Sequence, residues 1–247
     1  MRVKKEASGR RSVQTEFEVP GTPEEVWQAI ATGPGMEPRA VLTAWDPPRM
    51  FAAQGEGWGG SPPIATEWSV EARAGGVCLV RVVHSLFAST DDWDKQLEGT
   101  ESGWPGFFRT LRIYLTHFRG QRSAIMPFVA PVAGSESEAW ATLTAAFGMK
   151  DVSVGQRWTA PAGVPALSGV VEYVCQSPPD ALVRLDQPGP GVAALGAFNM
   201  GGQSMVAVNF YHYGDLATQT AARETPLWQA WIQERFPMPA GLMDANA

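Results

Sequence analysis

The side chains of this 247-residue chain best suited to moving a proton near neutral pH are its three histidines, His84, His117 and His212. His84 lies in an apolar stretch with the spacing of a strand, in which alternate residues point to one side. The residues that share its side are Cys78, Val80, Val82 and Leu86. His84 is therefore predicted to face the interior. There it pairs with the backbone, offers a hydrogen bond to a ligand, or acts as a general base.

The other reactive residue types form no catalytic or metal-binding pattern. His212 ends a similar strand-like stretch, and His117 lies near the end of a predicted helix, where a cation is favoured. The sequence contains no H-x-x-x-H, C-x-x-C, H-E-x-x-H or G-x-S-x-G spacing. Cys78 and Cys175 are therefore interpreted as reduced thiols. We predict no metal and no cofactor, and His84 is the only candidate for catalysis.

Aromatic and aliphatic side chains indicate a function more strongly than the reactive residues do. They recur at the spacing of one helix face and of alternate strand positions. Such residues either line a ligand space between a sheet and a helix or fill a core, as comparable stripes do in any protein. The predicted ligand-binding residues are Trp45, Trp68, His84, Trp104, Phe108, Leu111 and Leu115. Arg81 and Tyr114 are further candidates for polar contacts.

The first half of the chain has the elements that would position these side chains. Residues 12–19 alternate like a strand, and Thr22 then caps a short helix that contains Trp27. Strands are predicted at residues 40–45, 50–53, 64–72 and 77–87. A long helix from about residue 91 to residue 118 follows, and Pro105 should begin or kink its apolar half.

The same order of elements recurs in the second half of the chain. Trp140 corresponds to Trp27, and the pair Pro178-Pro179 corresponds to Pro47-Pro48. A closing helix contains Leu227, Trp228, Trp231, Ile232 and Phe236. We therefore predict an α+β chain made of two diverged copies of one unit, with domains at residues 12–119 and 136–237. Residues 120–135 are a linker or the first strand of the second copy.

Charge and hydropathy narrow the choice of partners. The formal net charge is −6, and residues 2–11 are basic, so the rest of the chain is more acidic still. An acidic body argues against a nucleic-acid groove. No apolar run approaches the ~20 residues that span a bilayer, and the basic start lacks a signal-peptide core. We expect a cytoplasmic protein that binds no nucleic acid and has no membrane span, and we leave a protein partner and the oligomeric state open.

Several motifs of the first copy are specific in combination. They are Phe17-Glu18-Val19-Pro20, Pro23-Glu24-Glu25-Val26-Trp27, Ala44-Trp45-Asp46-Pro47-Pro48, Arg81-Val82-Val83-His84-Ser85 and Gly103-Trp104. With these motifs, residues 12–118 resemble the START-like, or SRPBCC, superfamily, and residues 125–236 resemble it less specifically. The branch is that of homologues of the activator of the ninety-kilodalton heat-shock chaperone ATPase. The resemblance implies a helix-grip fold, a curved antiparallel sheet around a long C-terminal helix with a cavity for apolar ligands.

One departure from that pattern concerns the segment after the first helix. Trp27 and Pro47 are 20 residues apart, whereas Trp140 and Pro178 are 38 residues apart, so the first copy is 18 residues shorter. The missing length falls where the superfamily carries a second short helix and further strands. The cavity of the first copy is therefore open, collapsed, or completed by the second copy.

Three functions are compatible with these observations. The favoured one is non-catalytic binding of an apolar or aromatic small molecule in a cavity between sheet and helix. The first alternative, implied by the resemblance, is a cyclase or dehydratase that uses His84 as its general base. The second alternative is a chaperone-associated protein-binding module, which rests on the name of the branch alone.

Overall fold

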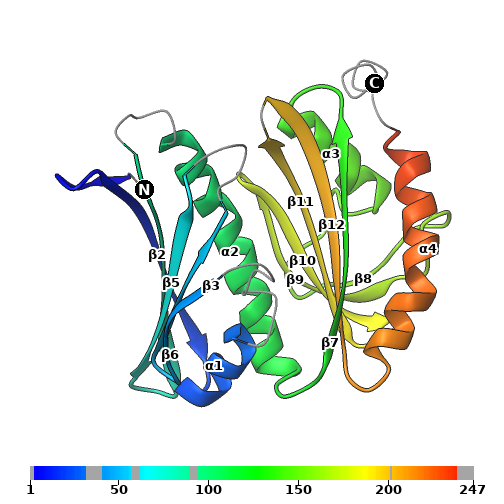
Figure 1. Cartoon of the computed structure of the whole chain (residues 1–247). Helices are drawn as coiled ribbons and strands as arrows, with labels where there is room; N and C mark the ends of the chain where they lie inside the picture. Colours follow the sequence, from blue (N-terminus) through cyan, green and yellow to red (C-terminus); the bar gives the residue numbers. More distant parts are fainter. Residues whose placement is uncertain (1–2, 32–40, 57–61, 89–93, 201, 238–247) are drawn as a thin grey trace. The chain divides into compact units, whose positions relative to one another are not determined.

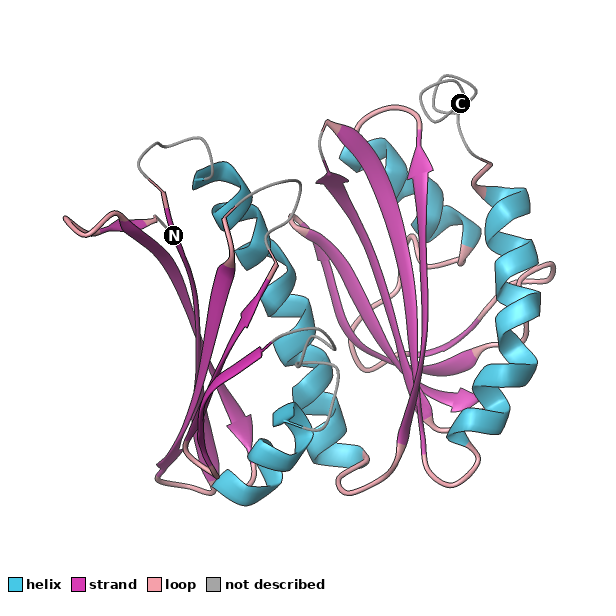
Figure 2. Cartoon of the chain, in the orientation of Figure 1, coloured by secondary structure: helices cyan, strands magenta, loops and turns pink. Residues whose placement is uncertain are grey.

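The computed structural model of the chain describes residues 3–31, 41–56, 62–88, 94–200 and 202–237, with the side chains of residues 94–102 left out. These residues form two compact units, Met1–Gly120 and Gln121–Ala247 (Figure 1). Each unit contains an antiparallel sheet and two helices, as Figure 2 shows. Within the described residues, no helix is both long and apolar enough to cross a membrane.

Unit 1 carries a six-stranded sheet in the order β1-β2-β6-β5-β4-β3. Its elements are β1 (Lys4–Lys5), β2 (Arg10–Pro20), α1 (Pro23–Ala31), β3 (Val41–Asp46), β4 (Met50–Gly55), β5 (Ile64–Arg73), β6 (Val77–Phe87) and α2 (Asp94–His117). β1 contains only two residues, so the sheet consists mainly of the other five strands. Both helices pack on one face of the sheet (Figure 1).

Unit 2 carries a six-stranded sheet in the order β7-β12-β11-β10-β9-β8. Its elements are β7 (Ser123–Val132), α3 (Glu136–Ala146), β8 (Arg157–Thr159), β9 (Ser168–Gln176), β10 (Pro179–Gln187), β11 (Gly191–Met200), β12 (Gln203–Tyr213) and α4 (Ala217–Arg235). The region left open in the sequence as a linker or a strand thus contains β7, which pairs with β12 along its whole length.

Five strands of each sheet correspond in order. β2, β6, β5, β4 and β3 of unit 1 occupy the places of β7, β12, β11, β10 and β9 of unit 2. Even an irregularity is repeated, because the pairing of β3 with β4 shifts by one residue between Leu42 and Ala44, and β9 with β10 shifts between Leu182 and Val183. The predicted α+β class and the predicted duplication are both confirmed.

The turn that leads into the short helix is also repeated in atomic detail. Thr22 and Glu25 cap α1 reciprocally, with the Thr22 amide donating to the Glu25 carboxylate at 2.8 Å and the Glu25 amide donating to the Thr22 hydroxyl at 3.3 Å. Ser135 and Glu138 cap α3 in the same way, at 2.7 and 3.3 Å. The residue before each cap is a glycine with positive φ, Gly21 and Gly134.

A side chain from the neighbouring strand ties each of these glycines in place. The Cys78 thiol donates to the Gly21 carbonyl at 3.3 Å, and the Ser204 hydroxyl donates to the Gly134 carbonyl at 2.8 Å. Burial is the main cause that raises the pKa of Cys78, so its thiol keeps the proton that this bond needs. Cys78 and Ser204 are therefore equivalent positions on β6 and β12.

The units differ most in the segment that follows the short helix. In unit 2, residues 147–167 add β8 and four buried apolar side chains, Phe147, Met149, Trp158 and Leu167. In unit 1 only residues 32–40, which lie outside the described part of the chain, separate α1 from β3. Within the described residues, the sheet of unit 1 ends at β3 and has no counterpart of β8.

Candidate functional site

The apolar face of α2 in unit 1 is directed at the sheet. Trp104, Phe107, Phe108, Leu111 and Leu115 recur at helical spacing and pack against residues of β2, β4 and β5. Pro105 lies inside this helix, at the beginning of its apolar half. The helix is continuous through Pro105, and the Thr110 hydroxyl donates to the Gly106 carbonyl one turn later, at 3.0 Å.

Aromatic rings link the sheet to the helix across this face. Trp68 of β5 contacts Trp104, Phe107 and Phe108 of α2, with ring centroids 5.1 to 6.1 Å apart. Phe17 of β2 stacks on Phe108 at 4.3 Å. Contacts between rings at these distances add to the stabilisation that burial alone provides. Side chains therefore fill the space between sheet and helix at these positions.

His84 is the one strongly polar ring at the edge of this cluster. Its side chain is only 5% exposed, and the ring stacks on Trp104 with centroids 5.2 Å apart and an interplanar angle of 27°. Its Nδ1 shares a 2.9 Å hydrogen bond with the hydroxyl of Thr66, the residue opposite it on β5. Burial lowers the pKa of His84 to about 4, so the ring is neutral at pH 7.

Two polar atoms of this ring pair are buried and have no hydrogen-bond partner among the residues that the structure describes. They are His84 Nε2 and Trp104 Nε1. Leaving a buried donor or acceptor unpaired costs about 1–3 kcal/mol, so most such groups in proteins are paired. Neighbouring side chains cover both atoms. The stacked pair thus presents unused hydrogen-bonding capacity inside an otherwise aromatic environment.

The other ligand-binding residues predicted from the sequence fall into two groups. Trp68, Phe108, Leu111 and Leu115 are buried in the core of unit 1, next to the His84 and Trp104 pair or farther along α2. Trp45 is 48% exposed on β3, where it contacts Trp27 and Phe51 and is linked to Trp104 through Phe51 and Trp68. It lies at the far end of the cluster.

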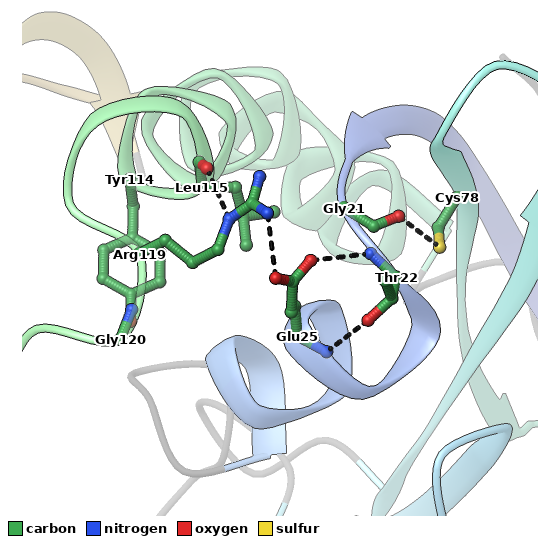
Figure 3. A network of polar contacts seen from close by, with 8 residues as sticks. All are labelled: Gly21, Thr22, Glu25, Cys78, Tyr114, Leu115, Arg119 and Gly120. Carbon is green, nitrogen blue, oxygen red and sulfur yellow. Dashed lines mark hydrogen bonds and ion pairs between the residues drawn. The ribbon is translucent and has the colours of Figure 1, made fainter.

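Arg81 and Tyr114 make their polar contacts elsewhere. Arg81 forms a 2.6 Å ion pair with Glu16 on the opposite face of the sheet, where the alternation of β6 places it. The Tyr114 hydroxyl accepts from the Gly120 amide at 3.2 Å, just beyond the end of α2 (Figure 3). The structure thus brings together His84 and Trp104 and leaves these two side chains out of the pair.

The sequence reasoning missed Thr66 as the partner of His84. The signal was present in the hairpin, because the Gly75-Gly76 turn pairs Arg73 with Val77, and the same register pairs Thr66 with His84. Phe107 was also missed, although it contacts both Trp68 and Trp104.

The end of α2 is tied to α1 by the network in Figure 3. Arg119 donates to the Leu115 carbonyl at 3.0 Å and forms a 2.8 Å ion pair with Glu25. The backbone bond from Thr22 is the main cause that lowers the pKa of Glu25, and Arg119 lowers it further. The Glu25 carboxylate is therefore held between the cap of α1 and Arg119, just beyond the end of α2.

Unit 2 has a different residue at the position of His84. Counting six residues along the strand from the equivalent Cys78 and Ser204 leads to His84 on β6 and Phe210 on β12. Phe210 packs on Trp228 of α4 with centroids 4.4 Å apart, and Phe147 stacks on the same indole at 5.8 Å. The equivalent contact between sheet and helix in unit 2 is therefore entirely aromatic.

Unit 2 keeps two polar features outside that contact. His212, two residues farther along β12, is buried with its Nδ1 unpaired, and burial is the main cause that lowers its pKa. A surface hollow of about 250 Å³ is lined by Ala146, Ala162, Gly163, Val164, Trp231, Glu234 and Arg235.

In both units a long C-terminal helix lies against the face of an antiparallel sheet that begins with one strand and a short helix. Each unit has the helix-grip fold. This is the fold implied by the resemblance to START-like proteins. The sequence matches no family model and no curated protein.

Solved structures are similar to the chain at low sequence identity. CalU16 from Micromonospora echinospora is 16% identical, over 47% of this chain and 83% of its own, with a TM-score of 0.36. DynU16, from the dynemicin biosynthetic locus, is 13% identical over 91% of this chain and 97% of its own, with a TM-score of 0.35. BexL, a di-domain ARO/CYC protein of the BE-7585A biosynthetic pathway, is 10% identical over 93% and 99%, with a TM-score of 0.36.

Proposed function

We propose that unit 1 binds an apolar, aromatic small molecule between its sheet and α2, beside His84 and Trp104, without transforming it. The observation that carries this proposal is the pair of buried unpaired atoms, His84 Nε2 and Trp104 Nε1, on two stacked rings. Aromatic walls with a few convergent polar groups are typical of small-molecule sites. A ligand that meets both atoms removes the penalty of leaving them unpaired.

The state of His84 favours binding over catalysis. A general base works best with a pKa near the working pH, and burial holds the pKa of His84 at about 4. One of its two ring nitrogens is already engaged by Thr66. The group that remains is a weak base with a hydrogen-bonding role, which is what recognition of a ligand requires.

Access to the pair requires movement, because neighbouring side chains cover both atoms. The backbone of α2 favours movement at this point, since Gly103 and Gly106 flank Trp104 and Pro105. Proline removes one helical hydrogen bond and glycine restrains the backbone least. We infer that α2 can bend at these glycines, while the part after Gly106 stays anchored by Phe108 and Leu115.

The test is native mass spectrometry of the chain purified from its own host, followed by denaturation to identify any molecule released. We expect an apolar molecule to copurify with the unchanged chain and to be lost from the double variant His84→Phe, Trp104→Phe. The matched control is Phe210→Leu, which alters the equivalent position of unit 2 and should keep the ligand.

Two results would overturn the proposal. One is a chain that carries no ligand from its host and binds no aromatic probe in solution. The other is a ligand that stays bound in the double variant and is released by Phe210→Leu, which would place the site in unit 2.

A further inference from the structure

The neutral stacked pair in unit 1 also restricts the chemistry of its ligand. Resting on the function proposed above, we infer that the site selects an uncharged molecule that bears a hydroxyl group, a phenol or an alcohol on an aromatic frame. The hydroxyl oxygen would face both His84 Nε2 and Trp104 Nε1, the two atoms that the protein leaves unpaired.

The inventory of donors and acceptors leads to this choice. The Trp104 indole N–H can only donate, so it requires an acceptor on the ligand. His84 shares its Nδ1 with the Thr66 hydroxyl, which itself can donate or accept, so Nε2 is either a bare acceptor or an N–H donor. A hydroxyl group satisfies both cases, because it accepts from Trp104 and either donates to Nε2 or accepts from it.

Other polar groups satisfy the pair less completely. A carbonyl or ether oxygen can accept from Trp104 but leaves Nε2 unpaired whenever that nitrogen lacks its proton. A carboxylate would bring a charge against four aromatic or neutral rings, since Trp104 contacts Trp68, His84, Phe107 and Phe108. A charge buried without a partner is strongly disfavoured, and a neutral histidine does not compensate it.

The stacking geometry favours a planar frame beside the hydroxyl. The rings of His84 and Trp104 are inclined by 27°, and Phe107 meets the indole edge-on at 85°. A flat ring inserted beside this pair gains face and edge contacts together, which an aliphatic chain does not.

The experiment compares four probes that share one ring system, namely 2-naphthol, 2-methoxynaphthalene, naphthalene and 2-naphthoate. Binding to the full chain is measured at pH 7 by titration calorimetry. We expect 2-naphthol to bind about tenfold more tightly than naphthalene, the gain that two net hydrogen bonds give. The methoxy compound should fall between the two, and 2-naphthoate should bind most weakly.

Two variants connect the preference to the named atoms. Trp104→Phe keeps a ring but removes the donor, and His84→Phe places in unit 1 the residue that occupies the same position in unit 2. In each variant, 2-naphthol should lose most of its advantage over naphthalene. As a direct readout, the indole N–H resonance that Trp104→Phe abolishes should shift when 2-naphthol is added and stay in place with naphthalene.

The outcomes separate this inference from the proposed function. Equal binding of 2-naphthol and naphthalene overturns the inference and leaves aromatic binding intact, and so does tightest binding of 2-naphthoate. Failure of all four probes to bind overturns the inference, and if the chain also carries no ligand from its host, the proposed function falls with it. A hydroxyl preference that persists in Trp104→Phe and in His84→Phe, each folded by circular dichroism, overturns the assignment to these residues.

Discussion

The same position in the two units holds His84 in one and Phe210 in the other, and each ring packs on a tryptophan of the long helix. In unit 2 the contact is apolar and Trp228 is only 1% exposed. In unit 1 the contact leaves two polar atoms buried and unpaired. One copy therefore shows what this contact looks like when it serves packing alone, and the other departs from that arrangement at a cost in stability.

The segment after the short helix is a second place where the cores of the two units differ. In unit 2, Phe147 and Trp158 enter the core from this segment, and Phe147 stacks on Trp228 at an interplanar angle of 8°. The described residues of unit 1 supply no equivalent of these two rings, and Trp45 at its sheet edge is half exposed. The two units therefore differ at this contact in two ways: unit 2 fills it with apolar rings, whereas unit 1 places His84 there and leaves two polar atoms unpaired.

The largest expected effect comes from removing the central indole of unit 2, Trp228. Trp228→Ala should destabilise unit 2 by about 3–5 kcal/mol, because it empties the volume that Phe147 and Phe210 enclose. Leu227→Ala, at the exposed neighbouring position, should change stability by less than about 0.5 kcal/mol. Hydrogen exchange read by mass spectrometry measures both, and equal protection in the two variants would contradict a packing role for Trp228.

Exchanging the two equivalent residues tests the comparison directly. Phe210→His should destabilise unit 2 by about 3 kcal/mol, since it loses apolar contacts and buries a polar ring without a partner. His84→Phe should stabilise unit 1 by about 1 kcal/mol, because removing the unpaired Nε2 outweighs the loss of the hydrogen bond to Thr66. Urea denaturation followed by circular dichroism measures each change. A loss of stability in His84→Phe would mean that His84 serves the fold and not a ligand.

The pH dependence of stability provides the next smaller effect. His84 has a pKa of about 4 in the folded chain against about 6.5 unfolded, so the unfolded state binds more protons between these values and stability falls as the pH is lowered. The expected loss from this group between pH 7 and pH 5 is about 2 kcal/mol. The lowered pKa of His212 also makes the folded chain less stable at low pH. The test is therefore the difference between the unchanged chain and His84→Phe in the stability lost from pH 7 to pH 5. Identical pH profiles for the two proteins would refute it.

The duplication was predictable because it rests on local signals. Trp27 with Trp140 and the two double prolines are visible in the sequence, and both capping residues precede an apolar helix. The inward direction of His84 also followed from alternation along one strand, since β6 is regular. Features that depend on neighbouring residues in the sequence, such as caps and the alternation along one strand, could therefore be predicted.

The details of the site depended on long-range register and on side-chain packing. The sequence could not reveal that His84 and Trp104 stack while their remaining nitrogens stay unpaired, because that geometry depends on where α2 crosses the sheet. Trp45 and Trp68 have the same residue type and similar strand surroundings, yet one is half exposed and the other buried. Only the order of strands in the sheet, with β3 at its edge, distinguishes them.

The smallest expected effect concerns the hydrogen bond to the carbonyl of the turn glycine. A thiol donates this bond in unit 1 and a hydroxyl donates it in unit 2. Ser204→Ala should cost about 1 kcal/mol, because the Gly134 carbonyl loses the hydrogen bond that the buried Ser204 hydroxyl donates at 2.8 Å. Cys78→Ser should change stability by less than about 0.5 kcal/mol, because the stronger hydroxyl donor offsets the loss of an apolar thiol. Thermal unfolding of both variants measures the difference. If Ser204→Ala is neutral, the repeated bond is a by-product of the fold and does not stabilise this turn.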